Sequence, residues 1–168
     1  VKLIHEPKQG YVYALKRGTK EANGEIFVFT DADTIVPPDW LNQYQKAYQD
    51  PKVVVVGGAA NFQPKFGLIF LIQAFLNLFG LLTKVASGFN FSLRRHTYEK
   101  IGGFSPQINF HADTDLILRA KKEGKAGFLL KNRVITSSRH YRGLEGIGYL
   151  SKGIINALWL FLFKKTLF

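Results

Sequence analysis

The sequence predicts an α/β fold with a mixed, mostly parallel sheet flanked by helices. The first 57 residues alternate between short apolar and amphipathic segments, in the order strand, helix, strand, helix, strand. This alternation favours parallel strands joined by right-handed crossovers. Residues 52–57 form a near-continuous valine run, which is typical of a strand covered on both faces. At 168 residues, the chain fits one domain with a sizeable core.

Turn and capping residues set the boundaries of the elements in the first half. Pro7 and Gly10 interrupt the chain after a first short strand, and Asn23-Gly24 follows the first helix as a C-cap. Asp39 is placed to cap the second helix. The expected elements are strands at 1–5, 26–30 and 52–57 and helices at 11–22 and 40–48.

A strongly apolar segment breaks this pattern in the middle of the chain. Residues 66–82 contain only Gln73 and Asn77 as polar side chains, and their number is near the lower limit for a membrane span. The amides and glycines favour a buried or interfacial helix instead. The remaining expected elements are strands at 89–93, 128–130 and 134–136 and helices at 97–101 and 113–122.

The C-terminal segment is expected to be distinct from a domain at 1–150. Residues 151–168 form an apolar run that contains Trp159 and, near its end, Lys164-Lys165. This composition suits a helix at a bilayer interface or the start of a membrane segment. The alternative is a C-terminal helix that docks on the domain.

The charge balance is strongly basic. The chain has 23 Lys and Arg against 12 Asp and Glu, which gives a formal net charge of +11. Such a surface suits anionic lipid or a phosphate-rich substrate. Nucleic acid is not expected as a partner, because no nucleic-acid-binding motif is evident. The absence of cysteine excludes disulfides and thiolate metal sites.

An Asp-Ala-Asp triplet, Asp31 to Asp33, directly follows the expected strand 26–30. In an open α/β sheet, ligands bind at the carboxyl ends of the strands. Two carboxylates there suit Mg²⁺ or Mn²⁺, and such a metal neutralises a diphosphate. The triplet therefore points to a nucleotide-activated substrate. The alternative is an ordinary turn, in which Asp is common.

Further motifs follow the triplet in a fixed order. The segment Gly88 to Arg95 reads Gly-x-Asn-x-x-x-Arg-Arg, Gly102-Gly103-Phe104 comes next, and Asp113 to Arg119 reads Asp-x-Asp-Leu-x-x-Arg. In this order and spacing, the chain resembles the family-two glycosyltransferases over nearly its whole length. The resemblance implies the GT-A fold and a nucleotide-sugar donor.

The resemblance also implies roles for the carboxylates. Asp31 and Asp33 would lie near the sugar nucleotide, with Asp33 holding Mg²⁺ or Mn²⁺ against the diphosphate. Asp113 would be the general base that deprotonates the acceptor hydroxyl. Asp115 is the alternative base, and otherwise a charge favoured at a helix N-terminus.

Five other residues are expected to bind substrate. Gly10 opens a segment that resembles the helix after the family's nucleotide loop. Arg139 and Arg142 resemble the family's basic motif and suit diphosphate oxygens, unless they form a solvated basic loop. The remaining candidates are Gly88 and Asn90, with a strand-edge amide as the alternative for Asn90. For Arg94 and Arg95, contact with an acceptor phosphate or with lipid headgroups is one interpretation, and an exposed charge pair is the favoured one.

The chain departs from the family pattern at three points. Ala112 stands where the family has Glu, and Lys16-Arg17 stands where it usually has Asn. We also expect the family's first strand-helix-strand unit to be missing. We therefore expect residues 1–168 alone to be inactive.

The expected activity is inverting, metal-assisted transfer of a hexose to a glycan or polyprenyl-linked acceptor. We expect this transfer at the cytoplasmic face of a membrane. The alternatives are a non-catalytic membrane-associated module with the same fold, or a nucleotidyltransferase, which also uses paired carboxylates and metal.

Overall fold

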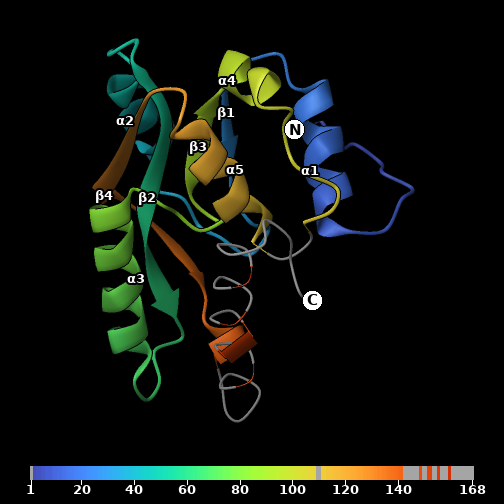
Figure 1. The fold of residues 1–168 in the computed structure, drawn as a ribbon. Helices are drawn as coiled ribbons and strands as arrows, with labels where there is room; N and C mark the ends of the chain where they lie inside the picture. Colours follow the sequence, from blue (N-terminus) through green and yellow to red (C-terminus); the bar gives the residue numbers. More distant parts are fainter. Residues whose placement is uncertain are drawn as a thin grey trace.

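A computed structural model describes residues 2–108 and 111–141, together with residues 148, 151, 152, 155 and 159. Arg142 and nearly all of the expected C-terminal helix at 151–168 lie outside the described residues. The described strands form one sheet with helices packed against it (Figure 1). The α/β architecture expected from the alternating pattern is confirmed.

The sheet is mixed, with the strand order β1-β3-β2-β4. β3 runs antiparallel to both of its neighbours, and β2 runs parallel to β4. Three strands therefore point the same way, but two of the three neighbouring pairs are antiparallel. The alternation along the sequence did not reveal this, because β3 is inserted between β1 and β2 from a later part of the chain. The strands are β1 Ile26–Phe29, β2 Val53–Gln63, β3 Phe91–Arg94 and β4 Lys125–Ser137.

Helices bury an apolar core on each face of the sheet. One core joins β1, β2 and β3 to the helices α1, α4 and α5, and its fully buried centre includes Phe91, Phe104 and Leu116. The other core packs α2 on β2 and β4 through Trp40 and Tyr44. The helices are α1 Tyr11–Glu21, α2 Trp40–Ala47, α3 Ile69–Thr83, α4 Arg95–Lys100 and α5 Ala112–Ala120.

Three expected elements differ from the structure. Residues 2–5 form no strand, since no described strand pairs with them. The segments 128–130 and 134–136 belong to one strand, β4, which follows β2 through a register shift between Gly58 and Ala60. The apolar segment 66–82 yields a helix of 15 residues. Within the described part of the chain, no helix is long and apolar enough to cross a membrane.

Candidate functional site

Three loops meet at one edge of the sheet. Phe29, the last residue of β1, pairs with Phe91, the first residue of β3, so the loop after β1 and the loop before β3 share this edge. The residues after β4 reach the same place, because Ile35 in the loop after β1 pairs with Ile135 of β4, and Arg139 forms an ion pair with Asp33. The candidate residues Asp31, Gly88 and Arg139 lie in these three loops.

The Asp31–Asp33 loop is fixed to the end of β4. Ile35 and Ile135 exchange backbone hydrogen bonds of 2.8 and 2.9 Å. The Thr34 hydroxyl donates to the Thr136 hydroxyl oxygen at 3.1 Å. A turn of the chain thus carries the two carboxylates to the residues that follow β4.

The carboxylates of this loop face both positive and negative charge. Arg139 Nη2 lies 3.1 Å from Asp33 Oδ2, in an ion pair whose arginine is the more exposed partner. Burial raises the pKa of the Asp31 carboxyl above its ordinary value, and the negative charges of Asp33 and Asp113 raise it further. Arg139 and His140 act in the opposite direction on this pKa.

Asp113 lies in the first turn of α5 and approaches the same edge. Its Oδ1 accepts a 2.8 Å hydrogen bond from the Thr114 backbone N–H, and the carboxylate also accepts one from the Gly88 backbone N–H. Burial raises the pKa of the Asp113 carboxyl, and these hydrogen bonds offset that rise only in part. A half-buried carboxylate with a raised pKa is suited to accept a proton.

Gly88 allows a close approach of three elements. A Cβ atom at this position would lie 2.7 Å from the Tyr11 hydroxyl oxygen and 3.4 Å from Asp113 Oδ2. A side chain at this position would therefore have to displace the Tyr11 ring and would contact the Asp113 carboxylate. Tyr11, the first residue of α1, is therefore a neighbour of this site that no motif in the sequence indicated.

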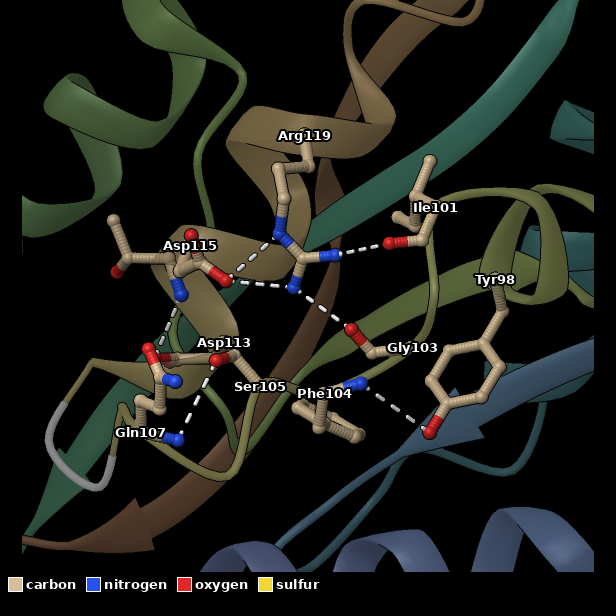
Figure 2. A network of polar contacts seen from close by, with 10 residues as sticks. Tyr98, Ile101, Gly103, Phe104, Ser105, Gln107, Asp113, Asp115 and Arg119 are labelled. Atoms are coloured by element: carbon tan, nitrogen blue, oxygen red, sulfur yellow. Dashed lines mark hydrogen bonds and ion pairs between the residues drawn. The ribbon is translucent and has the colours of Figure 1, made fainter. Parts of the chain in front are cut away.

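Asp115 has a different environment from Asp113, although it lies in the same helical turn (Figure 2). Its Oδ2 accepts hydrogen bonds of 2.9 and 2.6 Å from Nε and Nη2 of Arg119. Arg119 also donates to the backbone carbonyls of Ile101 and Gly103, at 2.7 and 2.8 Å. The pair thus fixes the turn at Gly102-Gly103, where both glycines have positive φ angles of 77° and 64°.

The expected binding residue Asn90 lies inside the fold, where its side chain contacts only other parts of the protein. Asn90 is fully buried, and its Oδ1 accepts hydrogen bonds from Trp40 Nε1 at 2.8 Å and from the Tyr44 hydroxyl at 2.7 Å. Its Nδ2 donates to the carbonyls of Ala59 and Asn132, at 2.9 and 2.8 Å. All of its donors and both acceptor positions are used, so no group remains for a ligand. The motif residue is a structural hub between α2, β2 and β4.

The other expected binding residues have simpler positions. Gly10 precedes α1 with a φ of 138°, a conformation that L side chains rarely adopt. Arg94 donates to the carbonyls of Val53 and Tyr48, and Arg95 to that of Gly24. Both arginines lie at the end of β3 remote from the Asp31 loop, so they are not part of this site.

The site residues fit a divalent cation that also binds phosphate oxygens. Mg²⁺ and Mn²⁺ sites in phosphate-transferring proteins use one or two carboxylates and complete their coordination with substrate phosphates and water. Asp31 and Asp33 supply that number of carboxylates, and their mutual repulsion favours a bound cation. Among the residues described, no cluster of three or more His, Cys, Asp or Glu side chains is placed to hold a metal by itself.

A family model for glycosyl transferase family 2 matches residues 1–111. The chain belongs to this family. Among curated protein sequences, no significant match is found. The family assignment confirms the relationship inferred from the sequence motifs.

Solved structures with the GT-A fold are similar over almost the whole chain. A mannosyltransferase from Pyrobaculum calidifontis, in complex with GDP-Man and Mn²⁺, is 21% identical with a TM-score of 0.70, and covers 94% of this chain and 46% of its own. Glucosyl-3-phosphoglycerate synthase from Mycobacterium tuberculosis, in complex with Mn²⁺, UDP-glucose and glycerol 3-phosphate, is 17% identical with a TM-score of 0.55, and covers 92% and 56%. The chain thus has the GT-A fold and spans about half the length of these proteins.

Proposed function

We propose that this chain is the catalytic part of an inverting, metal-dependent glycosyltransferase that uses a nucleoside diphosphate sugar as donor. The observation that carries the proposal is the convergence of Asp31, Asp33 and Asp113 on one sheet edge. Like charges raise the pKa of Asp31, and burial raises those of both Asp31 and Asp113. Raised pKa values within a cluster of carboxylates are typical of a functional site.

Asp31 and Asp33 would hold Mg²⁺ or Mn²⁺ in this account. The metal, when bound, supplies charge neutralisation for the nucleoside diphosphate leaving group. Arg139 pairs with Asp33 in the described structure and has a guanidinium suited to phosphate oxygens. We infer that Arg139 moves from Asp33 to the diphosphate when donor and metal bind together.

Asp113 would act as the general base. A single displacement at the sugar needs one group to take the proton of the acceptor hydroxyl, and no protein nucleophile. The raised pKa of Asp113 makes its carboxylate a stronger base than an exposed aspartate. Asp115 is a weaker candidate, because Arg119 already occupies its Oδ2.

The acceptor in this proposal is a glycan or a polyprenyl-linked glycan at the cytoplasmic face of a membrane, and the sugar is a hexose. The net charge of +11 supports binding of the protein to a membrane surface that is rich in anionic groups. One solved neighbour binds GDP-Man and another UDP-glucose with glycerol 3-phosphate, so hexose donors and a phosphate-bearing acceptor occur on this fold.

A non-catalytic module with the same fold is the second candidate. Ala112 favours it, because the resemblance to the family leads us to expect a glutamate at that position. Ala112, the first residue of α5, is buried in the core, so the position has no polar group to assist Asp113. A module without catalytic function has no need to bind a nucleoside diphosphate in a metal-dependent way.

The direct test is sugar transfer by the longest native gene product that contains this chain. Hydrolysis and transfer are measured with GDP- and UDP-sugars, with and without Mn²⁺, for the wild type, Asp33→Ala and Asp113→Asn. We expect both variants to lose activity and Asp113→Asn to keep donor binding. Absence of activity and of nucleotide binding in the wild type would favour the non-catalytic module.

A further inference from the structure

Helix α3 is attached to the sheet through one narrow stripe. Asn77 exchanges two 2.9 Å hydrogen bonds with the backbone N–H and carbonyl of Ala60, and Gln73 Oε1 accepts one of 2.9 Å from the Phe62 N–H. Since β3 pairs with β2 only at residues 55–57, these amides satisfy backbone groups that β3 leaves unpaired. The two polar side chains of the apolar segment thus fix which face of α3 is inward.

The outer face of α3 is apolar and exposed. Phe75, Leu78 and Leu82 are exposed to 65%, 55% and 72%, and the rings of Phe75 and Phe79 stack on each other at 6.1 Å. Single exposed apolar residues are ordinary, but a continuous stripe on one helix marks an interaction site. We call this stripe the α3 outer face. It consists of Leu68, Leu71, Phe75, Leu78, Phe79 and Leu82.

The elements around the α3 outer face carry only positive charge. The stretch 51–98, which contains β2, α3 and β3, has no Asp or Glu, and neither has 124–141, which contains β4. Lys65, Lys131 and Arg133 are exposed, and within the described residues none of them forms an ion pair. The acidic residues that balance charge elsewhere are absent here.

We propose that the α3 outer face docks on a membrane surface that contains anionic lipid, with α3 lying in the plane of the interface. An apolar helix face with basic residues beside it combines the two forces that hold interfacial helices. A second copy of this chain is a poorer occupant, because dimerisation through this face would bring two basic surfaces together.

Docking in this way would bring the candidate site close to the lipid. The loop that leads into α3 is bound to the residue before Arg139, because Ser138 donates to the carbonyls of Gln63 and Pro64 at 2.8 and 2.6 Å. α3 begins at Ile69, five residues after Pro64, so its first turn lies near the sheet edge that carries Asp33, and its last turn lies about 22 Å farther along. The proposal deepens the proposed function at this point, since it gives a lipid-linked acceptor a route to Asp113.

The test is flotation of the purified 168-residue chain with vesicles of phosphatidylcholine alone or with 30% phosphatidylglycerol. We expect binding to the anionic vesicles that weakens in 0.5 M salt. The double variant with Phe75→Glu and Leu78→Glu should bind at least tenfold more weakly. Leu41→Glu, which alters an exposed apolar residue of α2, is the matched control and should bind as the wild type does. Circular dichroism checks that each variant is folded.

A second measurement remains informative if the double variant does not fold. The variant Phe75→Trp adds one tryptophan on α3. The difference between its fluorescence spectrum and that of the wild type should shift to the blue when anionic vesicles are added. The proposal is overturned if the wild type does not bind vesicles, if the double variant binds as well as the wild type, or if ultracentrifugation shows a dimer that the double variant abolishes. Binding of GDP and UDP with Mn²⁺ is measured on the same samples, so failure of docking and failure of the proposed function are separable.

Discussion

Two polar clusters in this chain look alike in the sequence but differ in chemistry. Around Asn90, neutral groups are fully buried, and the Asn90 amide has a partner for each of its hydrogen-bonding groups. At the edge of the sheet, Asp31 and Asp113 carry raised pKa values that result from burial and, for Asp31, from neighbouring negative charge. The first cluster stabilises the fold. In the second, the ionised carboxylates are destabilised, and binding of a cation or a proton would remove that destabilisation.

The difference shows how a motif residue can be sorted into structure or function. Asn90 and Asp115 belong to motifs that suggested binding or catalysis, yet neighbouring groups of the protein already satisfy them. Asp113 lies two residues before Asp115, and its hydrogen bonds offset only part of the rise in pKa that burial causes. Whether a side chain already has hydrogen-bond partners within the protein therefore distinguishes structural from functional residues better than its place in a motif does.

The largest expected effect is on turnover in Asp113→Asn. Loss of a general base typically costs about 10²- to 10⁴-fold in rate, and the isosteric amide keeps the shape of the site. Steady-state kinetics of the longest native gene product measures the loss. In the wild type, turnover should also fall as the pH drops through a pKa above the ordinary aspartate value of 3.8, because the base is then protonated.

The control for that variant is Asp115→Asn. Its main consequence should be a weaker contact with Arg119, so folded protein should keep most of its turnover. Full activity in Asp113→Asn together with lost activity in Asp115→Asn would transfer the role of base to Asp115.

The second effect is on stability in Asn90→Ala. The substitution leaves the Trp40 N–H, the Tyr44 hydroxyl and two backbone carbonyls without their partner, and each buried unsatisfied group costs about 1–3 kcal/mol. We expect the free energy of unfolding in urea to fall by at least about 3 kcal/mol. Asn77→Ala, which removes two half-buried hydrogen bonds, should cost less. Equal losses in the two variants would contradict the description of Asn90 as a hub.

The third effect concerns the ion pair of α5. Arg119→Lys should lower the free energy of unfolding by about 1–3 kcal/mol, because lysine cannot donate to Asp115, Ile101 and Gly103 in the same fork geometry. Chemical denaturation measures the change. If Arg119→Lys instead lowered nucleotide affinity without a change in stability, the pair would belong to the binding site.

The smallest effect is a pH-dependent gain in stability in Asp31→Asn. A carboxyl whose folded pKa is raised costs stability when it is ionised, and this cost disappears once the pH falls below 3.8, the ordinary value. The variant should therefore be more stable than the wild type at pH 7, by about 0.5 kcal/mol for a half-exposed charge, and equal to it at pH 3. Thermal unfolding at both pH values tests this, and a loss of stability at pH 7 would contradict it.

The sequence predicted the fold class and most elements, since the alternation of apolar and amphipathic segments determines them locally. It also located Asp31, Asp33, Asp113 and Arg139, which the structure brings to one edge. It did not predict the insertion of β3 between β1 and β2, because strand order depends on pairing between distant segments.

The roles of Asn90 and Asp115 were also beyond the sequence. Each depends on partners from elsewhere in the chain, such as Trp40 for Asn90 and the Ile101 carbonyl beside Arg119 for Asp115. Spacing within a motif carries no information about such contacts. One signal was present, because Trp and Tyr in a buried helix need hydrogen-bond partners of their own.

The most direct test of the central claim is Mn²⁺-dependent binding of GDP and UDP, measured by calorimetry on the longest native gene product and its variants. We expect the wild type and Asp113→Asn to bind one of the nucleotides with equal affinity when Mn²⁺ is present, and Asp33→Asn to bind at least tenfold more weakly. Binding that is unchanged by Mn²⁺ or by Asp33→Asn would contradict the assignment of this sheet edge as the metal and diphosphate site.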